Sequence, residues 1–397
     1  MVIPFCRAGK KRPPRFDQHP VPPQLQRQRL GVHPVRCPHP EQARVPPVKG
    51  TGKERLYDGV TGSYYSCLNA KIWGLLSVDS IELCAGAGGQ ALGLETAGFT
   101  HRALVEIDAA CRATLSANRP HWNVIPAPGD IATFSGHRYA GIDLLAGGLP
   151  CPPFSVAGKQ LGADDERNLF PHALRIIDEC RPRAVLIENV RGFLDAVFSD
   201  YRTMLKSQLR RMGYVTDWRL FNASDFGVPQ LRPRVVVVAL RSDISDRFHW
   251  PEPRAERAPR VGETLVDLMA ADGWRGALPW ASGADDIAPT LVGGSKKHGG
   301  PDLGPTRARA AWAVLGVDGK GLADAAPAPD FAGMPRLTVR MAARIQGFPD
   351  DWAFTGGKTA AYRQVGNAFP PPVACAIGVQ LCRALGSHAA AGRSVHG

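Results

Sequence analysis

From Asp79 onward, short apolar runs alternate with stretches of helical period, and this alternation limits the possible fold more than any other feature of the chain. Buried strands are expected at 81–84, 103–107, 142–145, 184–187 and 235–240. Helices are expected at 90–97, 109–118, 167–180, 338–345 and 373–385. Strands that alternate with helices indicate an α/β fold with a mainly parallel sheet. Ligands of such a sheet bind at the carboxyl ends of its strands.

The alternation of strand and helix patterns ends between residues 242 and 335, where Gly, Pro, Trp and Arg dominate. Because a structureless loop of that length inside one domain is improbable, this part predicts a second, irregular domain. We expect a main domain at 77–245, completed by 360–390, and a small second domain at 246–359.

The positive charge is concentrated at the N-terminus. Of the net charge of +12, residues 1–78 carry +9, from 13 Lys and Arg against 4 Asp and Glu, and the remaining chain carries +3. The first fifty residues also hold 11 prolines and show neither helical nor strand period. Residues 1–76 are therefore predicted to be a disordered tail. It is either a basic arm that adds affinity for phosphates or an upstream extension of the reading frame.

Several protein classes are disfavoured. No run of about 18 apolar residues is present, so no membrane span is expected. The basic, Pro-rich N-terminus lacks the apolar segment of a secretory signal. Nine cysteines, an odd number without a CxxC pair, argue against a disulfide framework or a zinc ribbon. We expect a cytoplasmic protein without a metal.

A Gly-rich turn follows the first expected strand, with the sequence Cys84-Ala-Gly-Ala-Gly-Gly89. Glycines there let a ligand approach the backbone closely. Glu106 and Asp108 end the next strand about 20 residues on, where a carboxylate can accept both hydroxyls of a ribose. The turn does not have the GxGxxG spacing of dinucleotide sites. A nucleoside cofactor without a pyrophosphate, such as S-adenosylmethionine, is therefore favoured over NAD.

A displayed cysteine follows the third expected strand, in Gly147-Gly-Leu-Pro-Cys151-Pro-Pro-Phe-Ser155. Free cysteines usually pack as small core residues, but prolines on both sides place this one on a stiff loop. Methyltransferases that act on amino groups have Asp or Asn at this place, where the side chain accepts from the exocyclic amine. Because a thiol is a poor acceptor and a good nucleophile, Cys151 indicates that the target is a carbon.

Two further groups complete the constellation. Glu188 ends the strand 184–187, where partial burial should raise its pKa and let it donate a proton. Arg232 and Arg234 lead into the strand 235–240, and side chains at i and i+2 of an extended chain point the same way. They are expected to hold Glu188 or a phosphate.

These motifs, in this order, resemble the DNA (cytosine-5)-methyltransferase family, of the bacterial restriction–modification type, over about 79–390. The resemblance also rests on Gly129-Asp-Ile131, Gln230, Leu337-Thr-Val-Arg340, Gln346-Gly-Phe-Pro349 and Gln364-Val-Gly-Asn-Ala368. The chain departs from the family in three positions: Cys84 replaces the usual Phe, Pro152 a Gln, and Met341 a common Glu. None of these changes removes a group that the reaction requires.

The resemblance implies the methyltransferase version of the Rossmann-like fold and a set of site residues. Cys151 would add to carbon 6 of a flipped cytosine, while Glu188 protonates nitrogen 3 and Arg234, supported by Arg232, orients Glu188. S-adenosyl-L-methionine would be held by Cys84, Ala85, Gly86, Gly88, Gly89, Glu106, Ile107, Asp130, Ile131 and Asn367. The loop 155–167 would close over the base.

The resemblance further implies that 77–245 with 360–390 is catalytic and that 246–359 reads a short sequence of double-stranded DNA. DNA contacts are expected from Ser155, Lys159, Gln230, Lys296, Lys297, Arg307 and Arg309. We expect a monomer in the nucleoid, without an obligatory protein partner, that protects DNA from a cognate restriction endonuclease. Two rivals stay open: an RNA cytosine methyltransferase, and a DNA-binding protein that has lost catalysis.

Overall fold

The protein is described from a computed structural model, which covers residues 78–149, 168–293 and 300–386. Its strands are β1 (Val78–Leu83), β2 (Phe99–Val105), β3 (Leu144–Gly148), β4 (Ala184–Val190), β5 (Tyr214–Asn222) and β6 (Pro233–Arg241). They form one sheet in the order β2-β1-β3-β4-β6-β5. The neighbours among β1 to β4 pair in parallel, whereas β6 runs antiparallel to both β4 and β5. The mainly parallel α/β sheet expected from the sequence is confirmed.

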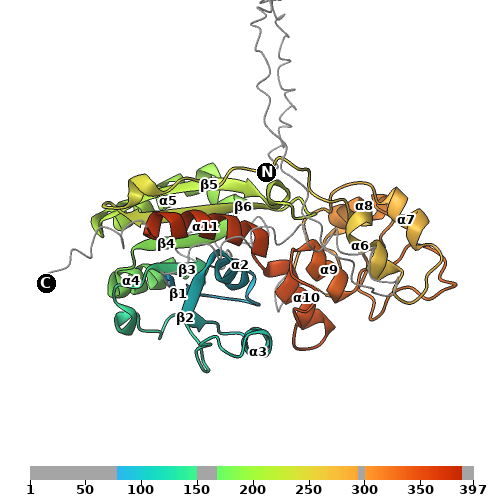
Figure 1. Cartoon of the computed structure of the whole chain (residues 1–397), viewed down its shortest axis with the longest axis horizontal. Helices are drawn as coiled ribbons and strands as arrows, with labels where there is room; N and C mark the ends of the chain where they lie inside the picture. The colour runs from blue at the N-terminus through green and yellow to red at the C-terminus, as the bar shows by residue number, and fades with distance from the viewer. Residues whose placement is uncertain (1–77, 150–167, 294–299, 387–397) are drawn as a thin grey trace, which may run out of the picture. The chain divides into compact units, whose positions relative to one another are not determined.

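Helices cover both faces of this sheet (Figure 1). The helices of the described residues are α2 (Gly89–Ala97), α3 (Ala109–Asn118), α4 (Phe170–Cys180), α5 (Ser199–Arg211), α6 (Val261–Met269), α7 (Ala277–Gly283), α8 (Thr306–Val314), α9 (Val339–Ile345), α10 (Lys358–Asn367) and α11 (Pro371–Gly386). Apolar side chains of α4 and α5 form one core with Leu83, Ile187 and their neighbours. Those of α2 and α11 form another core with the alternate residues of the same strands, such as Leu186.

Each strand expected from the sequence is present, with bounds shifted by a few residues, but two features of the sheet differ from expectation. The apolar pattern does not predict strand β5, because only part of this strand is buried and its charged residues interrupt the apolar run. Strand β6 is reversed relative to β4. Its β-branched sequence predicts a buried strand but carries no signal for direction, because both pairings satisfy the same pattern.

The segment 246–359 contains more regular structure than its composition indicated. Helices α6 to α9 lie within it, and α6 buries Val261, Leu265 and Met269, one side chain per turn. These residues share a core with Leu115 of α3 and with Val365 of α10. The two segments therefore meet across a continuous apolar core.

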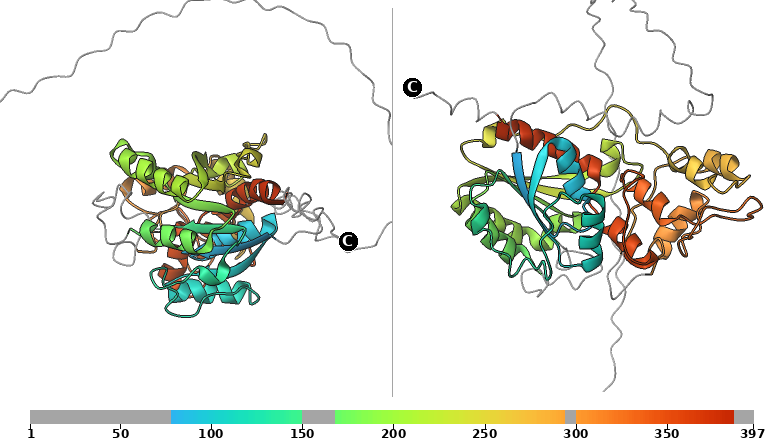
Figure 2. Two further views of the ribbon diagram at one scale, coloured as in Figure 1. Left: turned by 90° about the vertical axis from the view of Figure 1, so that its left-hand side faces the viewer. Right: turned by 60° about the horizontal axis from the view of Figure 1, so that its bottom comes forward.

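Helices α10 and α11 require a separate remark, because 358–386 is the one stretch of the described residues that is apolar and long enough to cross a membrane. About two thirds of its apolar window (67%) is buried inside the protein. Helix α11 packs closely on α2: a Cβ atom on Gly93 would lie 2.4 Å from the carbonyl oxygen of Pro371. Figure 2 shows α11 lying against the sheet, so this stretch is a core element.

Candidate active site

The Gly-rich turn between β1 and α2 is built from left-handed residues. Cys84, Gly86 and Gly88 have φ values of 55°, 53° and 85°. The amide of Gly86 donates to Glu106 Oε2 at 2.8 Å, and that of Gly88 donates to the carbonyl of Ala85 at 3.0 Å. Cys84 adopts a conformation that is uncommon for a residue with a Cβ atom. Burial raises the pKa of its thiol, which favours the neutral form.

Glu106 follows β2 and lies against this turn. Its Oε1 accepts from the amide of Asp108 at 2.7 Å, and its Oε2 accepts from Gly86. Burial raises the pKa of Glu106, although both amide bonds act in the opposite direction. Asp108 caps the N-terminus of α3, because its Oδ1 accepts from the backbone amides of Ala110 and Cys111. Ile107 between them is 64% exposed, an apolar side chain that is free to cover a flat ligand.

The segment Gly129–Ile131 joins the same site through a close backbone contact. Gly129 has φ 60°, and a Cβ atom there would lie 2.2 Å from the carbonyl oxygen of Glu106. Only glycine fits, and the contact places Asp130 next to Glu106. The Arg112 guanidinium fixes this arrangement by donating to the carbonyls of Glu106, Ile107 and Pro128. The structure thus brings together three segments that the sequence assigned to one cofactor.

Glu188 and Arg234 meet at the carboxyl end of β4. In the antiparallel pairing, Glu188 stands opposite Val236 and Arg234 opposite Val190, so the two side chains are diagonal neighbours on one face. Arg234 Nε lies 2.7 Å from Glu188 Oε1. Burial raises the pKa of Glu188, and the nearby charges of Arg234 and Arg232 lower it in part. The raised pKa expected from the sequence is confirmed in direction.

Arg232 and Gln230 have a different environment from that expected. Arg232 is fully buried and donates to the carbonyls of Leu291, Gly366 and Ala368 at 2.7–3.0 Å. Its hydrogen bonds therefore hold backbone and not Glu188. Gln230 is also fully buried: its amide nitrogen donates to Gln346 Oε1 at 2.6 Å, and its Oε1 accepts from the amide of Leu291. The expected DNA contact of Gln230 is corrected, because a fully buried amide bonded within the protein cannot reach a base.

The remaining expected residues are placed as follows. Asn367 ends α10 and is exposed, beside the backbone of Gly293. Arg307 is exposed and Arg309 half-buried, both on α8. Cys151, Ser155, Lys159, Lys296 and Lys297, the loop 155–167 and the tail 1–76 lie outside the described residues.

Two buried polar residues of this site were not singled out from the sequence. Glu82 of β1 is 1% exposed, its Oε2 has no hydrogen-bond partner within the described residues, and burial raises its pKa well above the ordinary value. Gln90 of α2 is 3% exposed, and neither polar atom of its side chain has such a partner. A charged residue inside the apolar run 81–84 was the available signal for Glu82. Gln90 resembles any polar helix residue in the sequence.

These residues fit S-adenosylmethionine. Glu106 offers carboxylate oxygens, Ile107 an exposed apolar surface, and Glu82 a buried oxygen without a partner, around a turn with positive φ angles. A ribose, an adenine and a charged methionine end need these three kinds of partner.

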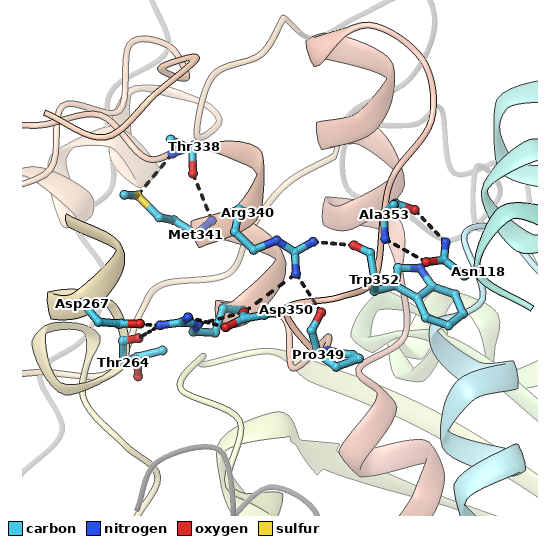
Figure 3. A network of polar contacts seen from close by, with 11 residues as sticks. Asn118, Thr264, Asp267, Thr338, Arg340, Met341, Pro349, Asp350, Trp352 and Ala353 are labelled. Atoms are coloured by element: carbon cyan, nitrogen blue, oxygen red, sulfur yellow. Dashed lines mark hydrogen bonds and ion pairs between the residues drawn. The ribbon is translucent and has the colours of Figure 1, made fainter. Parts of the chain in front are cut away.

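A second polar network fixes helix α9 against its surroundings (Figure 3). Arg340 donates to the carbonyls of Pro349 and Trp352, and Arg344 pairs with Asp267 of α6 and with Asp350. Met341 occupies the third position of the helix, where the family commonly has Glu. Its sulfur accepts from the amide of Thr338 at 3.4 Å, so a thioether completes the capping box in place of a carboxylate.

Comparison with known proteins assigns the family. A family model described as C-5 cytosine-specific DNA methylase matches residues 78–285 and 312–383. The chain is 58% identical over 315 residues to the Type II methyltransferase M.NaeI of Lentzea aerocolonigenes, a match that covers 78% of this chain and 76% of that protein. It is 54% identical over 308 residues to the Type II methyltransferase M.NgoMIV of Neisseria gonorrhoeae, covering 77% and 97%.

Among solved structures, a mutant of Spodoptera frugiperda DNMT2 aligns with a TM-score of 0.54 at 18% identity, covering 77% of this chain and 99% of that one. This likeness supports the fold. The family model and the two bacterial relatives go further, and the residues that the family model matches include Glu106, Glu188 and Arg234. The chain belongs to the C-5 cytosine-specific DNA methylase family and is a DNA cytosine-5-methyltransferase.

Proposed function

We propose that this enzyme methylates a cytosine within a short specific sequence of double-stranded DNA, through a transient covalent bond from Cys151 to a flipped base. One observation carries the proposal. Glu188, buried and paired with Arg234, stands opposite Gly148 in the sheet, and Cys151 follows Gly148 by three residues. An acid and a nucleophile are thus joined to adjacent strand ends, as attack on a pyrimidine ring requires.

The residues divide the chemistry between them. The Cys151 thiolate adds to carbon 6 while Glu188 gives its proton to nitrogen 3, which makes carbon 5 nucleophilic. Arg234 holds Glu188 in place through Oε1. S-adenosylmethionine, held by the turn 84–89, Glu106, Ile107 and Asp130, supplies the methyl group. Loss of the carbon 5 proton to water then expels Cys151 as thiolate, nitrogen 3 returns its proton to Glu188, and the aromatic ring is restored.

The substrate must present one cytosine outside the helix stack, because stacking shields both faces of a paired base. Flipping costs a few kcal/mol, which contacts with the DNA must offset. We assign sequence reading to 246–359, with the exposed Arg307 and the half-buried Arg309 of α8 as candidates for contacts. Lys296, Lys297, Ser155 and Lys159 are further candidates by sequence.

The biological role is inferred from the names of its relatives. M.NaeI and M.NgoMIV are Type II methyltransferases, so we propose that this chain protects DNA in the bacterial cytoplasm from a cognate endonuclease. It would act as a monomer, because the proposed chemistry needs no group from a second chain.

The decisive test is trapping. Duplex DNA with 5-fluorocytosine in the target position cannot lose the group at carbon 5, so the enzyme should remain covalently attached in the presence of the methyl donor. The variant Cys151→Ala should bind the same DNA and form no adduct. Bisulfite sequencing of DNA from a host that expresses the chain gives the target sequence. Methyl transfer to tRNA and not to duplex DNA would favour the RNA methyltransferase instead.

A further inference from the structure

Gln90 is a buried amide without a partner, at the start of the helix that follows the Gly-rich turn. It is the second residue of α2, and both polar atoms of its side chain lack a hydrogen-bond partner within the described part of the chain. A buried polar group is normally satisfied, and a group that is not satisfied commonly faces a bound molecule or a catalytic residue. The mechanism above gives Gln90 no role.

The neighbours of Gly148 show what Gln90 faces. A Cβ atom on Gly148 would lie 3.7 Å from Glu188 Oε2, 3.7 Å from the carbonyl oxygen of Cys84 and 3.9 Å from Gln90 Oε1. Three oxygens therefore converge on the space that this glycine leaves open. All three oxygens are acceptors, and the carboxylic acid form of Glu188 is the one group among them that can supply a hydrogen atom, either to a neighbouring oxygen or to a water molecule in this space.

We propose that Gln90 is a positioning residue for Glu188: its side-chain oxygen accepts the acid proton on Oε2, directly or through one water molecule. Arg234 Nε contacts the other oxygen, Oε1. The acid proton is thereby kept on Oε2 in the resting enzyme, and it passes to nitrogen 3 when the base replaces Gln90 as the hydrogen-bond partner of this O–H group. The inference rests on the proposed role of Glu188 as the acid that protonates nitrogen 3.

The charges around Glu188 make this role necessary. Arg234 of β6 and Arg232, which precedes this strand, both favour the ionised carboxylate, whereas burial favours the acid. The strand β3 contributes only Gly148 at this level, and Glu82 of β1 lies one step deeper on the same face. Gln90 and the Cys84 carbonyl are the neutral acceptors that stabilise the protonated form against the two guanidinium groups.

The test is the pH dependence of the chemical step. We would measure single-turnover methyl transfer to duplex DNA, with saturating S-adenosylmethionine, from about pH 5.5 to about 9.5. In Gln90→Met, the alkaline limb of the profile should move to lower pH by about 0.5–1 unit, because the acid form of Glu188 loses an acceptor. In Gln90→Glu, a second carboxyl group should move the limb to higher pH.

The control is Thr216→Val, which removes a different buried polar group, a hydroxyl that has no hydrogen-bond partner within the described residues, on the edge strand β5 away from Gly148. It should leave the profile unchanged.

An unshifted profile in both Gln90 variants overturns the proposal. So does a loss of affinity for S-adenosylhomocysteine without a pH shift, because Gln90 would then contact the methyl donor. If Gln90→Met fails to fold, the isosteric Gln90→Glu decides alone. A wild-type enzyme that forms no 5-fluorocytosine adduct would instead remove the proposed function itself.

Discussion

At the scale of single residues, Arg232 and Arg234 show how much position changes a side chain's task. They are two residues apart and look equivalent in the sequence. Arg232 is fully buried and holds three backbone carbonyls, whereas Arg234 pairs with Glu188 at 2.7 Å. The alternation of a strand puts both on one side, but Arg232 precedes β6 and only Arg234 reaches the register of the acid.

The substitution Glu188→Gln should lower the rate of methyl transfer by roughly 10²–10⁴-fold, because the proton donor is lost while the shape is kept. Under the proposed mechanism the acid form of Glu188 is required, so the rate of the wild type should fall as pH rises through the raised pKa of this group. Rates at several pH values check this, and binding of duplex DNA should persist. The matched control is Glu179→Gln at the end of α4, whose carboxylate pairs with Arg175. Equal losses in both variants would contradict the assignment.

Substitution of Arg232 should mainly reduce stability, whereas substitution of Arg234 should mainly reduce the rate of methyl transfer. Arg232→Met should lower the free energy of unfolding by about 2–4 kcal/mol, because three buried carbonyls lose their donor. Arg234→Met should cost only about 1 kcal/mol in stability but roughly 10² in rate, because Glu188 loses its orientation. Urea denaturation and single-turnover rates give the two quantities. A large stability loss in Arg234→Met with normal turnover would reverse the assignment.

At the scale of elements, the direction of β6 creates the site. Because β6 runs antiparallel to β4, its first residues lie at the carboxyl ends of the parallel strands, where Glu188 is. A parallel β6 would have placed Arg234 at the opposite edge. Gln230 and Arg232 directly precede β6 and bind the backbone of Leu291. The strand whose Arg234 pairs with Glu188 is therefore also connected to the segment 246–359.

The contact between Gly366 of α10 and Gly293 tests this connection. A Cβ atom on Gly366 would lie 2.4 Å from the amide nitrogen of Gly293, so two backbones must move apart in Gly366→Ala. We expect a loss of about 1–3 kcal/mol in the free energy of unfolding, together with slower methyl transfer. Gly283→Ala in α7, where a Cβ atom meets nothing within 4 Å, is the control and should change stability by less than about 0.5 kcal/mol. Thermal or urea unfolding of the two variants gives the comparison.

At the scale of the whole molecule, the described residues form a sheet with helices on both faces and a core that continues into 246–359. Trp312 of α8 and Trp352 are among the largest fully buried side chains of that shared core. Because the core is continuous, we expect that a substitution in the core of 246–359 also changes the stability of the sheet domain. Residues 1–76, which lie outside the described residues, carry most of the net positive charge and have no part in the proposed chemistry.

Removal of residues 2–74 should therefore leave the turnover number unchanged. It takes away all 13 Lys and Arg residues of the N-terminal part. If these residues form an arm on DNA, the slope of log affinity against log salt becomes shallower in the truncated protein. If they are an extension of the reading frame, the slope stays the same. Methyl transfer and DNA affinity at several salt concentrations answer both questions, and loss of turnover would show that the tail takes part in catalysis.

The sequence alone determined the alternating α/β order, the Gly-rich turn after the first strand, and the carboxylates at the ends of two strands, Glu106 and Glu188. These follow from local patterns, because a strand's period, a glycine turn and a carboxylate at a strand end are all written within a few residues. The tertiary structure alone decided the direction of β6, the burial of Gln230 and Arg232, and the convergence of Gln90 on Gly148. Each of these depends on which distant segment supplies the neighbouring oxygen or backbone, and pairing between distant segments leaves no trace in a local pattern.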